Sequence, residues 1–387
     1  MTRPRPCILF LHSSNELYGA DRSLLWLVLA VLDVARPIVA LPDDLPYGGA
    51  LAERLREERV EVRVGRVPVL RRGYLRPLAF PGWAVRALWD TVALTMLARK
   101  EHVDAVVTNT SGVVIGPIVA RMIGRPHIWY VREIVERPRW YRSFLRVAAQ
   151  AADGIVVAVS SSVADWLGPV PGRGPVVGHN GVDIGPVTLP LPATPTVAFI
   201  GRLNAWKGHE VFIAAATMVH RNRGDARFVL VGGPVPGDLT TEHQVREELG
   251  RIDPAEAWIS LRGEVADVRE VMQSAWAIAV PSTRPDPLPN VILEAMAEGR
   301  AVLGSRLGGI PEMIDDGVTG RLVDPADSAA LAGAMEWILA DRERCDRLGR
   351  AGYARAAAEF SREALIRRWR ATLAQATGSD AFSREDR

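Results

Sequence analysis

The chain has 387 residues, of which 48% are apolar and 24% charged, and its formal net charge is +2 at pH 7. This length predicts two domains, and the composition is typical of a globular protein without low-complexity tracts. The two cysteines, Cys7 and Cys345, are too few to indicate a disulfide framework or a metal site, so we expect reduced thiols in a cytoplasmic protein. No nucleic-acid partner is expected. The first apolar runs are too short for a signal peptide or a membrane span.

Short apolar runs alternate with helical patterns along the whole chain. Strands are predicted at 7–12, 36–42, 104–109, 127–131, 154–160, 196–201, 227–232, 258–263, 277–282 and 301–305. Helices are predicted at 22–33, 50–58, 209–222, 265–274 and 291–298. This alternation predicts an α/β protein with parallel sheets covered on both faces.

A segment rich in proline and glycine, at 181–195, is the best candidate for a linker. It divides the chain into two Rossmann-like, doubly wound domains, predicted at 1–187 and 193–360 and followed by a closing helix at 361–378. Ligands of such sheets bind beyond the carboxyl ends of the strands. The sequence therefore predicts a ligand site in a cleft where the two domains face each other.

The first half carries an excess of positive charge, with 23 Lys and Arg against 17 Asp and Glu in residues 1–187. Residues 62–89 hold six arginines and no acid, and Tyr74, Phe80, Trp83 and Trp89 lie among them. Such a stretch favours an anionic membrane surface or a phosphate-bearing partner. The alternative is an exposed loop followed by a helix whose tryptophans pack into the core.

Two segments of the second half carry candidate chemistry. Arg202 and Lys207 lie between a predicted strand and a helix, where side chains and backbone donors converge on an anion such as a diphosphate. Asp286 lies in the turn DPLPN, and Glu294 lies about one turn inside the following helix, with Asn290 as the expected N-cap. Each also has an ordinary interpretation, as a surface cation, a turn former or a first-turn acid.

The stretch AVPSTRPDPLPNVILEAMAEGRAVLGSRLGGIPEMIDDGVTGRLVDP, at 279–325, resembles the retaining glycosyltransferases of family 4, which have the GT-B fold. The segments GRLNAWKG, RGEVADVREVMQSAWAIAVPS, HNGVD and YGADRSLL are similar to further motifs of that family, so the resemblance covers nearly the whole chain. It is stronger after residue 196.

The resemblance implies a catalytic set of Arg202, Lys207, Asp286 and Glu294. The two cations would hold the diphosphate, Asp286 the hydroxyls of the transferred sugar, and Glu294 the ribose hydroxyls. The donor-binding residues that it further implies are Gly19, Arg132, Gly201, Gly263, Glu264, Val265, Leu288, Pro289 and Asn290. No metal and no cofactor is expected, because the two cations stabilise the leaving diphosphate. For Arg132, a surface pair with Glu133 is an equal alternative.

The hypothesis is a metal-independent, hexosyltransferase-type enzyme that moves a sugar from a nucleotide-diphosphate sugar, with UDP-sugar favoured, to a hydroxyl acceptor held by the N-terminal half. A sugar, polysaccharide or lipid-linked acceptor and peripheral association with the inner face of the cell membrane are expected with it. The alternatives are a nucleotide-sugar epimerase of the same architecture and an inactive homologue. A dinucleotide oxidoreductase is disfavoured, because neither half has G-x-G-x-x-G after its first strand. Asp286 stands where the family usually has Glu, and Leu288-Pro289 where it often has Phe-Gly.

Overall fold

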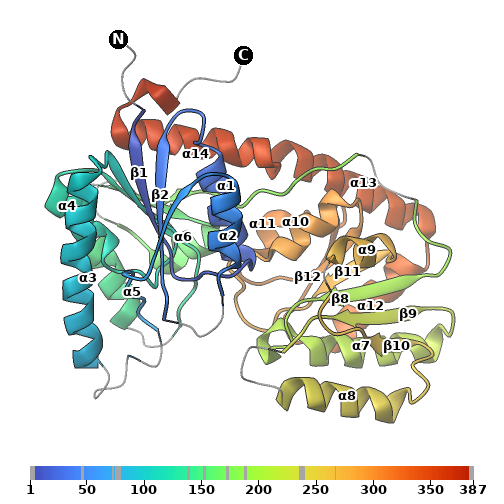
Figure 1. Cartoon of the computed structure of the whole chain (residues 1–387). Helices are drawn as coiled ribbons and strands as arrows, with labels where there is room; N and C mark the ends of the chain where they lie inside the picture. Colours follow the sequence, from blue (N-terminus) through green and yellow to red (C-terminus); the bar gives the residue numbers. More distant parts are fainter. Residues whose placement is uncertain are drawn as a thin grey trace. The chain divides into compact units, whose positions relative to one another are not determined.

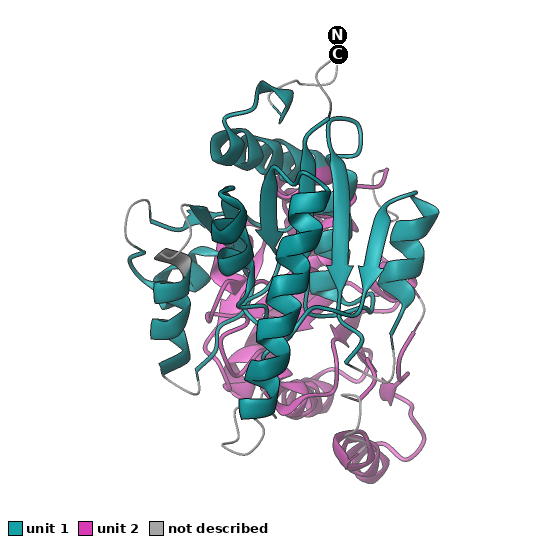
Figure 2. Ribbon diagram, turned by 60° about the vertical axis from the view of Figure 1, so that its left-hand side comes forward, with its two compact units in different colours: residues 1–180, 363–387 teal, residues 181–362 magenta. Residues whose placement is uncertain are grey.

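The computed structural model forms two compact units, each described here by itself (Figure 2). Unit 1 comprises Met1–Asn180 and Glu363–Arg387, and unit 2 comprises Gly181–Arg362. The structure describes residues 5–44, 48–71, 74, 80–136, 140–150, 154–170, 174–186, 190–234, 240–265 and 267–382.

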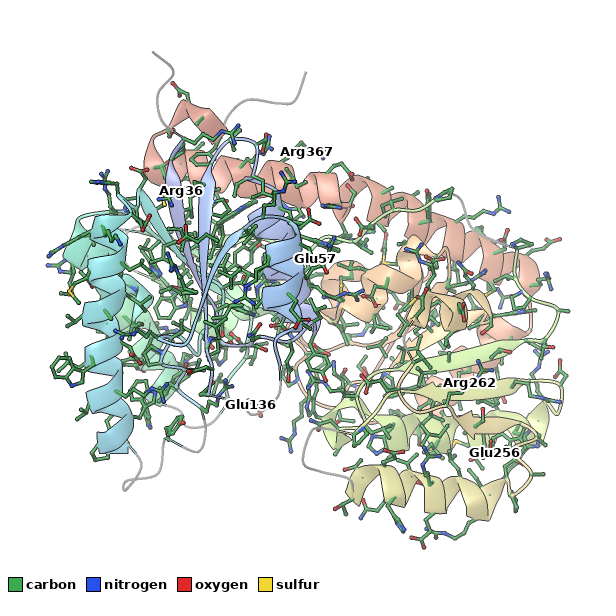
Figure 3. The ribbon with its side chains drawn as sticks, in the orientation of Figure 1. Arg36, Glu57, Glu136, Glu256, Arg262 and Arg367 are labelled. Atoms are coloured by element: carbon green, nitrogen blue, oxygen red, sulfur yellow. The ribbon has the colours of Figure 1, made fainter. Side chains whose placement is uncertain are left out.

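Within the described residues, unit 1 has a seven-stranded parallel sheet in the order β3-β2-β1-β4-β5-β6-β7. The strands are β1 Cys7–Leu11, β2 Arg36–Leu41, β3 Glu61–Val64, β4 Ala105–Thr108, β5 His127–Val131, β6 Gly154–Ala158 and β7 Val176–Val177. The central strands are buried on both faces, as in parallel sheets covered by helices. Arg36, labelled in Figure 3, lies at the start of β2 and forms ion pairs with Glu61 of β3 and with Glu101.

The helices of unit 1 cover both faces of this sheet (Figure 1). They are α1 Gly19–Leu29, α2 Ala50–Glu57, α3 Phe80–Lys100, α4 Gly116–Ile123, α5 Trp140–Gln150, α6 Ser161–Leu167 and α14 Arg362–Thr377, with the short η3 Asp380–Phe382 after them. Leu94 of α3 and Val119 of α4 share an apolar cluster with Leu9 of β1, whereas Trp369 of α14 packs against Phe10, the next residue of that strand. Successive strand residues point to opposite faces, so α3 and α4 lie on one face and α14 on the other.

Unit 2 has a six-stranded parallel sheet in the order β10-β9-β8-β11-β12-β13, again within the described residues. Its strands are β8 Thr196–Ile200, β9 Arg227–Val231, β10 Ile259–Leu261, β11 Ala277–Val280, β12 Ala301–Ser305 and β13 Gly320–Val323. Its helices are η2 Ala205–Lys207, α7 His209–Asn222, α8 Thr240–Ile252, α9 Val268–Gln273, α10 Asn290–Ala297, α11 Ile310–Met313, α12 Ser328–Leu339 and α13 Arg342–Glu359.

Both sheets reverse their strand order at one place, between β1 and β4 in unit 1 and between β8 and β11 in unit 2. Doubly wound sheets bind ligands at this switch point, beyond the carboxyl ends of the strands. The topology therefore places a candidate site at each of these two edges.

The predicted strands are confirmed, with ends shifted by at most two residues, and the helix predicted at 209–222 coincides with α7. The helix predicted at 265–274 begins later, at Val268, because the Asp267 side chain accepts a hydrogen bond from the backbone N of Arg269 and caps the helix there. Strands β3, β7 and β13 were not predicted. β3 alternates glutamate and arginine with valine, and β7 has only two residues.

Within the described residues, the basic, aromatic stretch at 62–89 includes most of the edge strand β3 and the first half of α3. Trp83 is partly buried and its indole N–H donates to Val69 O at 3.1 Å, as the packed alternative expects. Trp89 is 70% exposed, so the expectation that the tryptophans pack into the core is wrong for this residue. Arg72 and Arg76 lie outside the described residues. No helix among the described residues is both long and apolar enough to span a bilayer.

The chain passes between the units twice, at 180–181 and at 362–363. The two passages are hydrogen-bonded to each other, because Val182 N donates to Phe360 O at 2.8 Å and Arg362 N donates to Val182 O at 3.0 Å. Part of the predicted linker, residues 187–189, lies outside the described residues.

Candidate functional site

The first predicted cation of unit 2, Arg202, lies at the carboxyl end of β8. Gly201 N donates to Val231 O and Leu203 N donates to Gly233 O, both at 2.9 Å, so the chain stays tied to the end of β9 as it leaves the strand. The Arg202 side chain between these anchors is exposed. It therefore has access to a ligand at the strand edge.

The second cation, Lys207, forms an ion pair with Asp286. Lys207 Nζ lies 2.6 Å from Asp286 Oδ2, and the Asp286 side chain is almost completely buried. The ammonium also lies 4.4 Å from the centroid of the Trp206 ring, within the range of a cation–π contact. A cation and a carboxylate that lie 79 positions apart in sequence are thus placed side by side at the switch point of this sheet.

Four close backbone contacts hold the loops around this pair. Gly309 N donates to Asp286 O, and Thr283 N donates to Trp206 O, both at 2.8 Å. Gly308 has φ 62°, and a Cβ there would lie 2.6 Å from Asp286 N and would also overlap Asp286 O. Gly208 has φ 80°, and a Cβ there would overlap Pro281 O. Only glycine fits these positions without strain, so the pair rests on a closely packed backbone.

Glu294 and the residues at the start of α10 follow Asp286 in the chain. Leu288 and Pro289 are buried, whereas Asn290 and Glu294 are partly exposed. The expected N-cap at Asn290 is wrong, because Asn290 is the first residue of α10 and Pro289 occupies the cap position. Glu294 is the fifth residue of the helix, so it lies one turn inside as predicted.

The predicted base-binding segment, Gly263 to Val265, follows β10. Gly263 has φ 70°, and its O accepts a hydrogen bond from Gly232 N at 2.8 Å. A Cβ on Gly232 would overlap Gly201 O, and one on Gly233 would come within 3.2 Å of Glu264 Oε2. The ends of β8, β9 and β10 are therefore joined through glycines, which brings predicted donor-binding residues from distant segments to one edge.

Sequence reasoning missed Trp206 and Gly308, which position Lys207 and Asp286. Each lies within a motif that was noted for other residues, GRLNAWKG and GGIPE. Glu312, in the same GGIPE segment, is an acid in the first turn of α11. Within the described parts of the chain, no group of three or more His, Cys, Asp and Glu side chains is placed to hold a metal ion.

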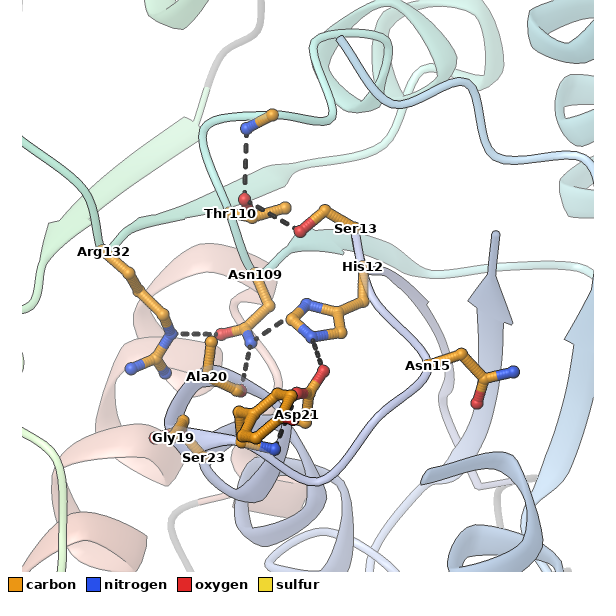
Figure 4. A network of polar contacts seen from close by, with 12 residues as sticks. His12, Ser13, Asn15, Gly19, Ala20, Asp21, Ser23, Asn109, Thr110 and Arg132 are labelled. Carbon is orange, nitrogen blue, oxygen red and sulfur yellow. Dashed lines mark hydrogen bonds and ion pairs between the residues drawn. The ribbon is translucent and has the colours of Figure 1, made fainter. Parts of the chain in front are cut away.

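In unit 1, Arg132 follows β5 and is buried at the carboxyl edge of the sheet (Figure 4). Its Nε donates to Asn109 Oδ1 at 2.8 Å and its Nη1 donates to Asn180 Oδ1 at 2.5 Å. The guanidinium lies 4.2 Å from the centroid of the Tyr130 ring, and burial lowers the pKa of Arg132. The alternative of a surface pair with Glu133 is therefore wrong.

The Glu133 carboxylate has other hydrogen-bond partners. It accepts from Thr110 Oγ1 at 2.7 Å and from the backbone N of Ser111 at 3.0 Å. Arg132 thus keeps its positive charge next to neutral amide oxygens, and its Nη2 has no hydrogen-bond partner among the described residues. A buried donor without a partner is costly, so Nη2 is available for an anionic or carbonyl oxygen.

A second polar group lies beside Arg132, at the switch point between β1 and β4 (Figure 4). His12 Nε2 lies 2.9 Å from Asp21 Oδ1, and Asn109 Nδ2 donates to His12 Nδ1 at 3.4 Å and to Ala20 O at 3.3 Å. Because Nδ1 accepts, this network assigns the ring proton to Nε2, which donates to Asp21. Asp21 Oδ2 in turn accepts from Tyr18 N at 3.0 Å.

This network fixes the start of α1. Gly19, the predicted donor-binding glycine, is the first residue of the helix, and Figure 4 shows it beside Ala20 and Asp21. His12 and Asp21 were not predicted as site residues. The available signal was their place in the chain, because His12 directly follows β1 and Asp21 lies in the motif YGADRSLL.

Comparison with known proteins identifies relatives of this chain in sequence and in fold. The family model of the glycosyl transferases group 1 matches residues 194–341. The α-maltose-1-phosphate synthase of Mycobacterium tuberculosis is 32% identical over 282 residues, which cover 64% of this chain and 72% of that protein. The D-inositol 3-phosphate glycosyltransferase of Corynebacterium diphtheriae is 37% identical over 172 residues, which cover 42% of this chain and 39% of that protein.

Among solved structures, Anabaena HepE in complex with UDP superposes with a TM-score of 0.81 and 23% identity, covering 95% of this chain and 99% of that one. The same protein has also been solved with UDP-glucose. Two Rossmann-like units with this similarity define a GT-B protein. The chain belongs to the group 1 glycosyltransferases and is a glycosyltransferase enzyme.

Proposed function

We propose that the chain is a retaining glycosyltransferase that transfers a sugar from a UDP-sugar to a hydroxyl acceptor without a metal ion. The observation that carries the proposal is the Lys207–Asp286 ion pair at the switch point of the unit 2 sheet, with Arg202 at the neighbouring strand end. The UDP and UDP-glucose complexes of HepE support uridine as the base.

The proposed reaction breaks the bond between the anomeric carbon and the diphosphate oxygen. The acceptor oxygen forms the new bond on the same face of the sugar, and its proton passes to the departing diphosphate. Negative charge grows on that diphosphate, and Arg202 and Lys207 stabilise it; such electrostatic stabilisation is usually the largest contribution to catalysis.

The ion pair suggests different roles for its two residues, with Lys207 binding the diphosphate and Asp286 binding the sugar. In the free protein Asp286 neutralises Lys207, and its buried carboxylate is held in one orientation. When the diphosphate approaches the ammonium, Asp286 keeps its second oxygen for a sugar hydroxyl. Glu294, one turn inside α10, is the proposed partner of the ribose hydroxyls, and the backbone at Gly263 to Val265 is the proposed contact of the base.

The acceptor is proposed to bind in unit 1. Arg132, whose buried Nη2 has no partner among the described residues, is a proposed donor-binding residue of unit 1, for a phosphate oxygen. A lipid-linked acceptor in polysaccharide assembly is the class that we favour, and peripheral membrane association follows from it.

The test is to incubate the purified chain with acceptors and a panel of UDP-sugars and other nucleotide sugars. UDP release and product mass report turnover, and NMR of the product reports its anomeric configuration. We expect release of UDP and a product with retained configuration. Lys207→Ala should lower kcat/KM by a factor of about 100 or more, as removal of one charge-stabilising donor does. Its stability should also fall, by about 1–3 kcal/mol, because the buried Asp286 carboxylate loses the cation that neutralises it.

Arg251→Ala is the matched control, since it removes an exposed cation of the same unit that lies on α8. It should leave turnover unchanged. Inversion of configuration would refute retention, a product of unchanged mass would indicate an epimerase, and binding of UDP-sugars without turnover would indicate an inactive homologue.

A further inference from the structure

Helix α3 is apolar on both sides. The buried side, which packs on the sheet, is formed by small and medium residues, namely Ala87, Thr91, Leu94, Thr95 and Ala98. The exposed large apolar residues of its outer side are Val85, Leu88, Trp89, Val92 and Met96. They recur every three to four positions and so form one stripe along the helix. Leu88 is 66% exposed and Trp89 70%, so these two large side chains point away from the core.

The neighbouring helix α4 continues this stripe. Ile118 and Met122 are exposed on α4, one turn apart. Met122 lies against α3, because its Sδ is 3.6 Å from Thr95 Oγ1 and its O accepts from the Arg99 guanidinium at 2.9 Å. We call the exposed apolar residues of the two helices the α3–α4 face. Figure 1 shows the two helices side by side at the edge of unit 1.

The charged residues around this face are mostly basic. In α3 and α4, all of whose residues the structure describes, the cations are Arg86, Arg99, Lys100 and Arg121, and the acid is Asp90. Asp90 is largely buried and lies 3.5 Å from Arg86. The two helices therefore carry a net charge of +3, with exposed cations at their C-terminal ends.

Several arginines of the basic stretch at 62–89 are paired with acids, so they contribute less net positive charge to this surface than the sequence suggests. Arg71 is bonded to Asp44 by two contacts of 2.6 Å, and Arg63 is paired with Glu61. Arg86 also contacts Asp43 at 3.2 Å. The apolar stripe, rather than the arginine-rich stretch, is therefore the principal feature of this surface.

We propose that the α3–α4 face is a docking surface for an anionic phospholipid bilayer. An amphipathic helix that lies in a membrane surface places its apolar side below the headgroups and keeps basic residues at their level, and tryptophan is favoured at that depth. The exposed stripe with Trp89 and the flanking cations fits this pattern. The inference deepens the membrane part of the proposed function and rests on it for the nature of the acceptor.

A second copy of the chain fits this face less well. A symmetric dimer would pair the face with itself, and each copy would bring its net charge of +3 against the same charge on the other. Like charges near an apolar interface repel more strongly than in water. An anionic bilayer supplies the opposite charge.

The position of the face in unit 1 also suits a lipid-linked acceptor. The described residues 65–71, which precede α3 in the chain, reach the carboxyl edge of the sheet, where Leu70 N donates to Gly112 O at 2.8 Å and Arg71 donates to Ser13 O at 3.1 Å. Ser13 and Gly112 follow β1 and β4, the strands of the switch point. A bilayer under the face therefore lies next to the edge at which Arg132 is found.

The experiment is co-sedimentation of the purified chain with phosphatidylcholine vesicles, with and without phosphatidylglycerol, at low and high salt and without any nucleotide sugar. We expect binding to the anionic vesicles that weakens with salt. The double variant Leu88→Gln/Trp89→Gln should weaken it by about tenfold or more, because two inserted side chains are lost. Arg99→Gln/Lys100→Gln should weaken it by about fivefold per cation.

Met218→Gln/Val318→Gln is the matched control, because it removes two exposed apolar side chains of unit 2. It should bind vesicles as the unaltered chain does, and circular dichroism should show all variants folded. Absence of binding at low salt, or equal binding by the Leu88/Trp89 variant, would overturn the proposal. A concentration-dependent dimer that this variant dissociates would assign the face to a second copy instead.

The vesicle-binding experiment tests the docking surface independently of the sugar-transfer experiment that tests the proposed reaction. Transfer to a water-soluble acceptor should be unaffected in the Leu88/Trp89 variant, because both side chains are exposed on α3 and neither is a proposed binding residue. Vesicle binding without sugar transfer would count against the proposed function alone. Sugar transfer without vesicle binding would count against the docking surface alone.

Discussion

Asp286 reaches Lys207 although its side chain is one methylene shorter than that of the glutamate that the family resemblance implies at this position. The backbone compensates for the shorter side chain. Gly309 N holds Asp286 O at 2.8 Å, and the missing side chain of Gly308 lets the two loops touch. The glycine after β12 and the acid after β11 therefore act together, and a change at one should disturb the other.

Substitution of Gly308 by alanine should reduce both stability and activity. Its φ of 62° is strained for alanine, and the new Cβ would overlap the Asp286 backbone. Strain of this kind costs about 1–3 kcal/mol. Displacement of Asp286 from Lys207 should also lower kcat/KM by at least about tenfold, because small misplacements of positioning groups are costly. Thermal melting and UDP release measure the two effects.

Gly317→Ala is the control for backbone strain alone. Gly317 has φ 81° in the same unit, but no atom lies within 4 Å of the position of its Cβ. This variant should lose a similar amount of stability and keep its turnover. If both variants lose the same fraction of activity, the contact between Gly308 and Asp286 does not position the carboxylate.

Sequence reasoning identified these residues without their contacts. Lys207 and Asp286 were assigned to different ligand groups, and no local pattern indicates an ion pair between positions 79 apart. For Arg132 the sequence allowed two interpretations, a ligand-binding residue or a surface pair with Glu133. The burial of Arg132 depends on Asn109 and Asn180, which come from other parts of unit 1. Residue type and strand-end position are readable from sequence, whereas the partner of each side chain depends on the tertiary fold.

At the level of elements, β5 carries a buried histidine against α4. His127 is completely buried, its Nε2 lies 2.8 Å from Thr108 Oγ1, and burial lowers its pKa to about 3. A Cβ on Gly116, the first residue of α4, would lie 3.0 Å from this nitrogen. There is little space for water, so protonation of His127 in the folded state is unfavourable.

This burial predicts a loss of stability in mild acid. The unfolded chain binds the proton with a pKa near 6.5 and the folded chain with one near 3, so the contribution is fully present above 6.5 and is lost as pH falls toward 3. Between pH 7 and pH 5 the loss should be about 2 kcal/mol, which lowers Tm by about 4 °C or more. Thermal melting of the chain and of His127→Gln at both pH values measures this difference.

His127→Gln should show a smaller shift between the two pH values, whereas His243→Gln, at an exposed position on α8, should behave as the unaltered chain. An equal shift in all three proteins would show that other groups cause the acid sensitivity.

The same element illustrates which parts of the fold were predictable. The strand at 127–131 was found because five apolar or aromatic residues follow Pro126 without a break. The sequence of α3 has apolar residues on two opposite sides, so its pattern could not show which tryptophan is buried. Trp83 packs and Trp89 does not, because the sheet covers only one side of the helix.

For the molecule as a whole, the last helix completes the unit in which the chain begins. Trp369 of α14 is buried, its indole N–H donates to Leu27 O of α1 at 2.9 Å, and its ring lies 6.2 Å from that of Phe10 and 6.4 Å from that of Tyr130. Arg370 adds two contacts of 2.8 Å to Asp33. The sequence predicted this helix but left open which half it packs on, because its apolar spacing does not identify the surface that it covers.

Trp369→Ala should therefore destabilise unit 1 selectively. Loss of a buried tryptophan costs about 3–5 kcal/mol, and the tryptophan's contacts lie in β1, β5 and α1. Hydrogen exchange should show faster exchange in these elements and in α14, while β8 to β13 of unit 2 keep their protection. Arg367→Ala is the control, because Arg367 is an exposed residue of the same helix (Figure 3), and it should change neither unit. Equal loss of protection in both units would show that they unfold together and that α14 does not stabilise unit 1 alone.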